Sequence, residues 1–407
     1  MSRPKLLIAH PWMGRGGSEA TAMWTLQALQ DDCDLTFTTA ANLTDADWEA
    51  LNLTYGTRVD PSRLHRIKAP ALPGVNGPHR LPHLQNRYFE RHCHRIAPAF
   101  DLCVSTYNPI YFGQPAIHLI GDFSFSEEMR RRLSVHGEEP YRHRQTWLRR
   151  LYLAAGGWIE LRKPPLREWD DLVLANSAWA ARQLDEHFLL PGAGVLHPPV
   201  PLPTAPVGVE RDPFGFVCLG RVVPEKEIER MVGILARVRG HGYPVAFTIV
   251  GRFDESDYAR KIAGLVRQHN DWIRTPGFLQ LEEKRAVLAS HTFALHACRI
   301  EAFGIAVAEM AAVGCVPLVP ETGGAGEIVP MPELQYSTDD EAVEKILSLL
   351  RNPAHVAALS EKMPESAARF APARFVERLR ESVLDSLRRP PRCANDELAE
   401  KNLPAAH

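Results

Sequence analysis

The sequence predicts an α/β protein built from two doubly wound, Rossmann-like domains that face each other across a cleft. Apolar runs of strand length alternate with helical patterns in both halves of the 407 residues, which is typical of parallel βαβ winding. Between the halves, residues 196–206 hold five prolines in eleven positions, and neither a helix nor a central strand tolerates that density. The length also suits two domains of ordinary size.

The N-terminal half begins with a strand, a glycine-rich loop and a helix. Ser18 is the expected N-cap of that helix, because its hydroxyl can accept a hydrogen bond from a first-turn amide, and Glu19 lies in the first turn. Apolar runs predict strands over residues 5–10, 35–39, 102–106, 116–121 and 172–176.

The alternation restarts after the proline-rich linker. Strands are predicted over residues 215–220, 245–251, 292–296 and 316–320, and helices over 227–239, 256–268, 303–312 and from 340 onward. We therefore expect an N-terminal domain over residues 1–200 and a C-terminal domain over 207–370. A helix over 371–388 is expected to rejoin the first domain, and the proline- and charge-rich residues 389–407 are expected to form a disordered tail.

Composition and charge exclude several function classes. The chain is 45% hydrophobic and 24% charged, as in soluble globular proteins, and its formal net charge of −2 argues against a nucleic-acid binder. No apolar stretch is long enough for a signal peptide or a membrane span. Seven cysteines without a CxxC pair favour a reducing, cytoplasmic location. Residues 58–167 hold 18 Lys and Arg against 9 Asp and Glu, a local net charge of +9.

Two motifs at predicted strand ends suit phosphate. Gly16 and Gly17 lie between the first strand and its helix, where backbone amides can approach an anion; the alternative is a tight strand-to-helix turn. Arg221 and Lys226 follow the first strand of the second half, and two cations five positions apart suit a diphosphate. The alternative there is a pair of solvated surface cations.

A third motif places two acids eight positions apart around one helix. Glu301 precedes the helix and Glu309 lies about two turns inside it, so both can face the cleft. A buried carboxylate needs a partner, and the hydroxyls of a sugar or ribose are suitable donors. The alternative is a first-turn acid and a salt-bridged core acid. The loop at residues 323–324 supplies a further stretch of open glycine backbone.

Taken together, these motifs resemble those of retaining glycosyltransferases with the GT-B fold, specifically family 4 (glycosyl transferases group 1). The resemblance is strongest over residues 215–330, and within the family the motifs are similar to those of mannosyltransferases that extend lipid-linked oligosaccharides. The matching segments, in family order, are residues 16–19, 176–177, 198–200, 220–226, 249–251, 276–278, 301–304 and 323–324.

The resemblance implies a role for each matching residue. Arg221 and Lys226 would hold the donor diphosphate, Glu301 would approach the donor sugar, and Glu309 would bind the ribose hydroxyls. Further donor contacts would come from Gly16 and Gly17 beneath the phosphates, the loops Gly251–Arg252 and Gly277–Phe278 against the base, and the amides of Phe303, Gly304 and Ile305. The family needs neither a cofactor nor a catalytic metal, and its donor is a nucleotide-diphosphate sugar.

One position departs from the family pattern. Many relatives carry a histidine at the end of a strand in the first domain, and here Asp122 occupies that place, with His118 four residues earlier. Asp122 could orient a sugar hydroxyl or the acceptor. A hydrogen-bonded core histidine is the alternative for His118. A metal site at His92 and His94 is discounted, because residues i and i+2 do not share a helix face.

The predicted partners are a nucleotide-sugar donor and a hydroxyl acceptor, either a glycan, a lipid-linked molecule or a small molecule. The basic stretch 130–167, with Trp147, Leu148, Leu151 and Tyr152, could meet anionic lipid at the inner face of a membrane; the alternative is a solvated helical surface. The remaining hypotheses for function are a nucleotide-sugar epimerase, another GT-B sugar-nucleotide enzyme and a non-catalytic sugar-nucleotide binder.

Overall fold

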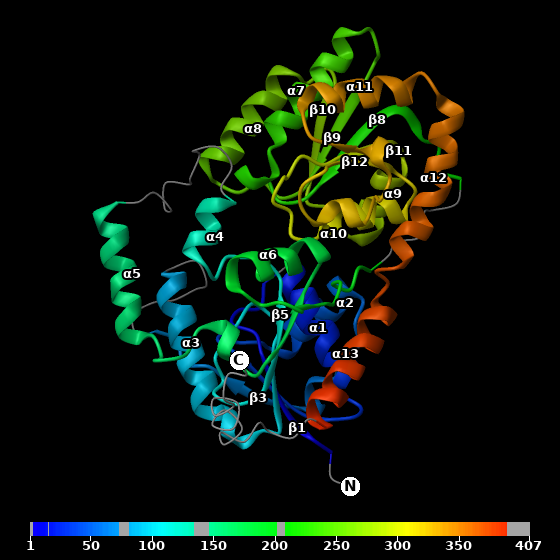
Figure 1. Ribbon diagram of the computed structural model, residues 1–407. Helices are drawn as coiled ribbons and strands as arrows, with labels where there is room; N and C mark the ends of the chain where they lie inside the picture. The colour runs from blue at the N-terminus through cyan, green and yellow to red at the C-terminus, as the bar shows by residue number, and fades with distance from the viewer. Residues whose placement is uncertain (1–2, 15, 73–80, 134–145, 202–207, 389–407) are drawn as a thin grey trace, which may run out of the picture.

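Two parallel sheets, one above the other in Figure 1, organise the chain into two lobes. The computed structural model describes residues 3–14, 16–72, 81–133, 146–201 and 208–388. The strand order is β3-β2-β1-β4-β5-β6-β7 in the seven-stranded sheet and β10-β9-β8-β11-β12-β13 in the six-stranded sheet. In both sheets the order reverses direction next to the first strand, and ligands bind outside such a switch point at the carboxyl ends of the strands.

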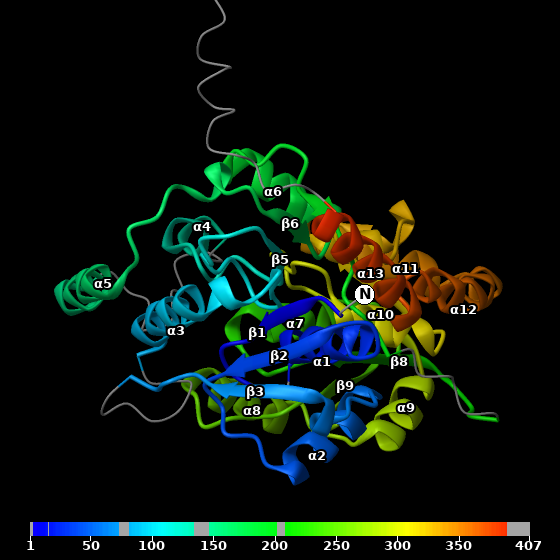
Figure 2. The same ribbon diagram turned by 90° about the horizontal axis from the view of Figure 1, so that it is seen from below.

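The N-terminal lobe holds the seven-stranded sheet. Its strands are β1 (Lys5–Ala9), β2 (Asp34–Thr39), β3 (Leu64–Lys68), β4 (Leu102–Ser105), β5 (Ala116–Ile120), β6 (Leu172–Ala175) and β7 (Gly194–Val195). Its helices are α1 (Gly17–Leu29), α2 (Asp45–Tyr55), α3 (Pro82–Ile96), α4 (Glu127–Arg132), α5 (Trp147–Ile159) and α6 (Ala178–Phe188). In Figure 2, α5 lies at the rim of this lobe with α3 on its inner side.

The C-terminal lobe holds the six-stranded sheet. Its strands are β8 (Asp212–Leu219), β9 (Ala246–Val250), β10 (Ile273–Gly277), β11 (His291–Leu295), β12 (Val316–Pro320) and β13 (Gln335–Tyr336). Its α-helices are α7 (Ile228–Gly240), α8 (Asp257–Gln268), α9 (Leu281–Ala289), α10 (Ile305–Ala312), α11 (Asp339–Leu350) and α12 (Pro353–Ala368). Two 3-10 turns that bear on the site are η5 (Pro224–Lys226) and η6 (Gly324–Glu327).

The last described helix, α13 (Pro372–Arg388), returns to the N-terminal lobe. Phe375, Leu379 and Val383 are buried within its core, and Arg380 Nε donates a 2.7 Å hydrogen bond to the carbonyl of Ala28 at the end of α1. The chain therefore crosses between the lobes twice, once in each direction (Figure 1).

Some local expectations differ from the structure. Ser18 is not the N-cap of α1: the helix begins at Gly17 with Gly16 in the cap position, and the Ser18 hydroxyl instead donates to Glu19 Oε2 at 2.9 Å. Four strands were absent from the predicted set and lie at the edges of the two sheets, namely β3, β7, β10 and β13. Three parts of the expectations lie outside the described residues: the tail over 389–407, residues 202–206 of the linker, and residues 134–145 of the basic stretch.

Within the described ranges, none of the helices combines the length and the apolar character that crossing a membrane requires.

Candidate active site

The two lobes touch where the helices α1 and α10 begin. A Cβ atom on Gly17 would lie only 2.8 Å from Ile305 Cδ1, so the first residues of the two helices are in contact. Nearby, Ser177 Oγ donates a 2.5 Å hydrogen bond to the Ala302 carbonyl. The positive ends of two helix dipoles therefore meet at the junction between the lobes, which favours an anion at this place.

Lys226 and Glu301 form an ion pair on the C-terminal side of this junction. Lys226 ends η5, after β8, and its ammonium donates to the Glu301 carboxylate; their side chains are 22% and 18% exposed. Burial opposes ionisation of both groups, but their mutual attraction prevails, so the pKa of Glu301 is lowered and the pKa of Lys226 is raised. Both groups are therefore charged throughout the neutral range.

Arg221 adds a second cation to this site. It follows Gly220 at the end of β8 and is exposed, and among the described residues it has no acidic partner. Its charge acts on Lys226, whose pKa it lowers slightly against the stronger opposite effect of Glu301. An unpaired guanidinium next to a paired ammonium leaves a net positive charge, as an anionic ligand requires.

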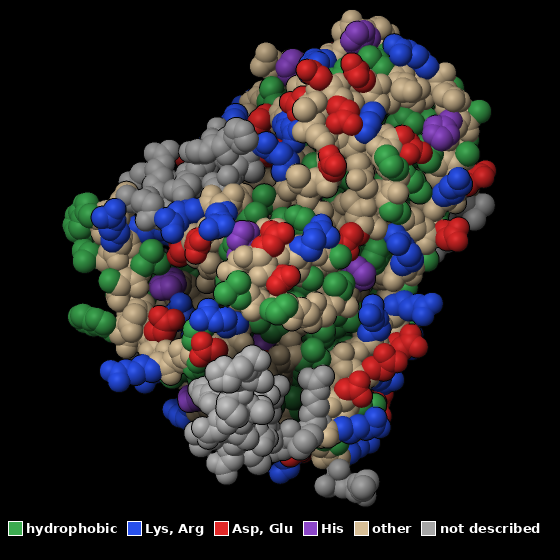
Figure 3. Space-filling model, in the orientation of Figure 1, with side chains coloured by type: hydrophobic (Ala, Val, Ile, Leu, Met, Phe, Trp, Pro, Cys, Tyr) green, Lys and Arg blue, Asp and Glu red, His purple; other side chains and the backbone are tan. Residues whose placement is uncertain are grey.

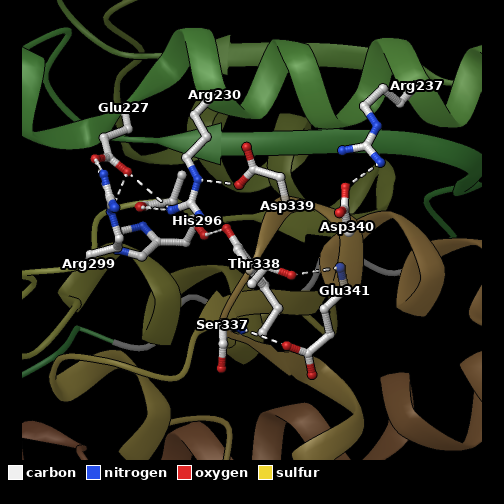
Figure 4. A network of polar contacts seen from close by, with 12 residues as sticks. Glu227, Arg230, Arg237, His296, Arg299, Ser337, Thr338, Asp339, Asp340 and Glu341 are labelled. Atoms are coloured by element: carbon white, nitrogen blue, oxygen red, sulfur yellow. Dashed lines mark hydrogen bonds and ion pairs between the residues drawn. The ribbon is translucent and has the colours of Figure 1, made fainter. Parts of the chain in front are cut away.

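A polar network begins at the residue that follows Lys226 (Figure 4). Glu227, the next residue, has a left-handed backbone (φ 48°) that costs a non-glycine residue about 1 kcal/mol. Its carboxylate accepts from Arg299 at 2.5 Å and from Arg230 at 3.2 Å. Arg230 also binds Asp339 at 2.6 Å. The network thus ties the Lys226 turn to the loop that carries Glu301.

Backbone packing fixes the Glu301 loop. The amide of Gly324 donates to the Glu301 carbonyl at 2.7 Å, and a Cβ atom there would lie 2.1 Å from the Ala302 carbonyl oxygen. Gly304, the N-cap of α10, has φ 104°, which favours glycine. The loop at 323–324, expected to offer open backbone, is instead packed against this loop and supports it. The Phe303 ring is buried, which leaves its backbone as the part available to a ligand.

Glu309 forms an ion pair with a different lysine from the one that Glu301 contacts. Its carboxylate accepts two hydrogen bonds from Lys284 of α9, at 2.9 and 3.0 Å, with only 13% of the side chain exposed. The expectation that a carboxylate here needs a partner is met by an ammonium in the structure. The ribose role of Glu309 remains a prediction.

The carboxyl ends of β9 and β10 form a surface next to the Gly220 turn that precedes Arg221. The Gly251 amide donates to the Gly277 carbonyl at 3.0 Å, and a Cβ atom on Gly251 would lie 1.8 Å from the Gly220 carbonyl oxygen, so only glycine fits. The guanidinium of Arg252 lies 5.8 Å from the centre of the Phe278 ring, which is half exposed. A planar base can stack on such a surface.

In the N-terminal lobe, side chains of α1 and α2 accept hydrogen bonds from the glycine loop. The Gly14 amide donates to Glu19 Oε1 at 3.1 Å, and the Gly16 amide donates to the Tyr55 hydroxyl at 2.9 Å. Two amides of the loop are therefore already bonded, and an anion at Gly16 would have to replace the Tyr55 hydroxyl.

Asp122 lies in a polar cluster at the end of β5. Its Oδ1 accepts from Asn108 Nδ2 and from the Ser124 amide, both at 2.8 Å, and Tyr107 lies 3.5 Å from its Oδ2. His118 lies apart from this cluster, fully buried, with Nε2 2.8 Å from Asp171 Oδ2. The geometry of His118 is that of a hydrogen-bonded core histidine.

Sequence reasoning missed several residues that shape the site, namely His10, Tyr107, Asn108, Glu227, Lys284, His296 and Cys298. Burial lowers the pKa of His10 to about 4. His296 and Cys298, in the loop after β11, bring potential metal-ligand atoms within 4.8 Å of Glu301. Glu227 could have been found as a buried acid directly beside a proposed site cation; no local pattern marks Lys284. His92 and His94 contact Thr38 and the Phe112 carbonyl separately.

Comparisons with known proteins bear on the C-terminal lobe and on the fold. The family model described as Glycosyl transferases group 1 matches residues 205–369, so the C-terminal lobe carries the sequence pattern of that family. No curated protein matches the chain.

Solved structures similar to this chain span nearly its whole length. HepE of Anabaena in complex with UDP-glucose is 15% identical, with a TM-score of 0.64 over 94% of this chain and 100% of that chain. Sucrose-phosphate synthase of Thermosynechococcus elongatus is 16% identical, with a TM-score of 0.67 over 94% and 99%. WaaG, a glycosyltransferase involved in lipopolysaccharide biosynthesis, is 14% identical, with a TM-score of 0.60 over 95% and 100%. The chain has the GT-B fold of these proteins.

Proposed function

We propose that the protein is a retaining glycosyltransferase that moves a hexosyl unit from a nucleotide-diphosphate sugar to a hydroxyl acceptor. In this proposal residues 207–370 form the donor domain and residues 1–200 the acceptor domain. The observation that carries the proposal is the Lys226–Glu301 pair, which lies beside the exposed Arg221 where α1 and α10 begin. The family match and the UDP-glucose bound by HepE support a nucleotide sugar as the donor.

The negative charge of the diphosphate favours its binding at the positively charged part of the site. Arg221, Lys226 and the amino end of α10 would neutralise the negative charge that develops on the leaving phosphate, which is a large part of catalysis in such transfers. Two protein cations supply that charge, so the proposed reaction is independent of a metal and of a cofactor. As Lys226 turns to the phosphates, Glu301 becomes free to accept a hydrogen bond from a hydroxyl of the donor sugar.

The nucleoside fits the surface next to the ion pair. The base would lie against the Gly251–Arg252 and Gly277–Phe278 loops, where the guanidinium already faces a ring. Ribose hydroxyls would donate to Glu309, taking over hydrogen bonds that Lys284 makes in the structure. Gly16 and Gly17 would approach the phosphates from the other lobe, with the amides of Phe303, Gly304 and Ile305 opposite.

The acceptor hydroxyl would attack the anomeric carbon from the face that the phosphate leaves. In that geometry a departing phosphate oxygen takes the acceptor proton, and the configuration is retained without an enzyme nucleophile. Asp122, held by Asn108 and the Ser124 amide, would orient a hydroxyl of the sugar or acceptor. The transferred sugar is expected to be a hexose, with mannose a leading candidate.

The test begins with a thermal-shift screen of UDP-, GDP- and ADP-sugars, since a bound donor stabilises the fold according to its affinity. The selected donor is then assayed with hydroxyl acceptors, with and without EDTA, and the anomeric configuration of the product is read by NMR. Arg221→Ala, Lys226→Ala and Glu301→Ala should remove turnover in folded protein, whereas Arg237→Ala, at an exposed ion pair, should not. Rates like the wild type in all three would refute the site.

The same assay separates the alternatives. An epimerase converts the donor in the absence of an acceptor, whereas a transferase at most hydrolyses it slowly. A non-catalytic binder shows the thermal shift with neither reaction.

We further propose that the stretch 130–167 brings the enzyme to an anionic membrane at the cytoplasmic face. The outer side of α5 presents Trp147, Leu148, Leu151 and Trp158, which are 69%, 60%, 59% and 91% exposed. Figure 3 shows hydrophobic side chains at this edge of the molecule with Lys and Arg close by. Exposed aromatic and aliphatic groups next to arginines suit the interface of an anionic bilayer.

Flotation with vesicles tests this contact. The wild type should float with phosphatidylglycerol vesicles at low salt and much less with phosphatidylcholine vesicles. Trp158→Ser should weaken flotation, whereas Leu53→Ser, at a residue of α2 that is 79% exposed, should leave it unchanged. Equal flotation of the Trp158 and Leu53 variants would contradict the contact.

A further inference from the structure

The loop between β11 and α10 contains a side-chain cluster that the proposed reaction does not use in full. His296, Cys298 and Glu301 come from one six-residue segment, and their Nε2 or Nδ1, Sγ and carboxylate oxygen atoms all lie within 4.8 Å of one another. In the described part of the chain this is the single group of three or more such residues with this spacing.

His296 supplies the observation that points to a ligand. The residue is 4% exposed, and its Nε2 lies 3.3 Å from Glu301 Oε2 but, within the described residues, has no hydrogen-bond partner of adequate geometry. The nitrogen faces the Glu301 carboxylate without a well-formed hydrogen bond, so its desolvation is only partly compensated. It is therefore available as a ligand.

We propose that His296, Cys298 and Glu301 form a binding site for a thiophilic divalent cation, with Zn²⁺ as the representative ion. An imidazole nitrogen, a thiolate and a carboxylate oxygen are ligands that zinc prefers, and three protein ligands leave a fourth position for water. Bonds of about 2.0–2.3 Å bring tetrahedral ligand atoms to roughly 3.5 Å from one another, so the side chains must draw together by about 1 Å.

The charges balance without any other group. The Cys298 S–H bond breaks, its proton passes to the buffer, and the thiolate and the Glu301 carboxylate together neutralise the dication. The Glu301 contact with Lys226 is lost, and Lys226, whose side chain is 22% exposed, can turn its ammonium to the solvent. No oxidation or reduction takes part.

Occupation of the site would inhibit the enzyme, an effect that rests on the proposed function. The metal would hold the Glu301 carboxylate, which the donor sugar needs in the proposed reaction. Such a metal acts against turnover and differs from a catalytic metal, so the expected insensitivity of the reaction to EDTA is unaffected.

Binding is tested on the full chain with Co²⁺ as a spectroscopic probe and Zn²⁺ as its competitor. The wild type should show a thiolate-to-cobalt charge-transfer band that one equivalent of Zn²⁺ removes. Cys298→Ser should abolish the band, and His296→Gln should weaken Zn²⁺ affinity by more than about tenfold. Cys315→Ser, another buried cysteine of this lobe, is the matched control and should leave both unchanged.

Two results would overturn the proposal: no charge-transfer band in the wild type, or a band that persists in Cys298→Ser. If Cys298→Ser does not fold, as circular dichroism will tell, the His296→Gln affinity decides: unchanged binding refutes the site. These readouts need no substrate, so they stand even if the chain transfers no sugar. Inhibition by Zn²⁺ that the Cys298 variant escapes would then link the site to turnover.

Discussion

At the scale of single residues, the site depends on two largely buried, opposite charges that stabilise each other. Lys226 and Glu301 are each charged because the other is present, and each would be unstable alone. Ion pairs of this kind add little to stability relative to apolar groups, but removal of one partner is strongly destabilising. In the proposed reaction the donor diphosphate would replace Glu301 as the partner of Lys226, so the pair would keep a cation ready for the anion.

A double substitution separates catalysis from stability at this pair. Lys226→Met should lower the free energy of unfolding by about 3 kcal/mol, because Glu301 keeps a charge without a partner. Adding Glu301→Gln should recover most of that loss, yet turnover should remain absent. Urea denaturation of the two variants and an assay with the selected donor measure this. Equal destabilisation by the single and double variants would show that the two charges do not interact.

His10 gives a dependence of stability on pH. Burial lowers its pKa to about 4, against the attraction of Glu19, which raises it. Between pH 6.5 and 4 the unfolded chain binds the proton more readily, so stability declines as the pH falls through this window, by up to about 3 kcal/mol. His10→Asn keeps a group next to Thr106 and does not titrate.

The comparison for His10 is the difference between two stability curves. We expect wild type and His10→Asn to converge as the pH falls from 7 to 4, because only the wild type loses the contribution of this histidine. Parallel curves over the whole range would contradict the pKa assigned to His10.

At the scale of elements, the turn η5 and the start of α7 hold Lys226 in place. This support depends on Glu227, whose backbone is left-handed and whose carboxylate accepts hydrogen bonds from Arg299 and Arg230. A strained residue persists where its surroundings hold it firmly. The consequence is that the Lys226 turn and the Glu301 loop are expected to shift together.

Glu227→Gln tests whether Glu227 supports the Lys226 turn. Loss of the charge leaves Arg299 without its carboxylate, so the Glu301 loop should loosen, and kcat/KM should fall about tenfold or more with a larger change in KM than in kcat. Arg237 forms an exposed ion pair with Asp340, drawn in Figure 4, so Arg237→Ala should change stability by less than about 1 kcal/mol. Unchanged kinetics in Glu227→Gln would show that Lys226 needs no such support.

A comparison of individual strands shows how much of the fold can be predicted from the sequence. β12 spans the predicted residues 316–320, because all five are buried and form one apolar run. β3 was not predicted, since only Leu64 of its five residues is buried and an edge strand need not be apolar. Parallel winding predicted that the carboxyl ends of the strands lie at one edge of each sheet. It therefore predicted that Arg221, Lys226 and Glu301 lie close together. The partnership of Glu309 with Lys284 joins two helices and leaves no trace in local spacing.

At the scale of the whole molecule, the lobes meet through a tightly packed contact between the first residues of α1 and α10. Gly17→Ala would place a methyl carbon about 2.8 Å from the end of the Ile305 side chain, so that side chain or the lobes must shift. We expect donor affinity to fall, with an overpacking cost of about 1–3 kcal/mol. Isothermal titration with the selected donor measures the change.

The matched variants make this result specific. Gly17→Ala combined with Ile305→Ala should restore donor affinity, because the colliding methyl group is gone. Gly233→Ala, inside α7 with open space around it, should stabilise the protein by about 1 kcal/mol without altering donor affinity. A Gly17→Ala variant that binds the donor as the wild type does would show that the lobes meet differently when loaded.

The return of α13 to the first lobe has a consequence for synthesis. Phe375, Leu379 and Val383 cover the core of a lobe whose strands are all encoded before residue 196. A ribosome making this chain must complete the whole second lobe before that cover can leave the exit tunnel. The lobe that is started first is therefore finished last, and until then its apolar surface under α13 is exposed to whatever else the cell offers.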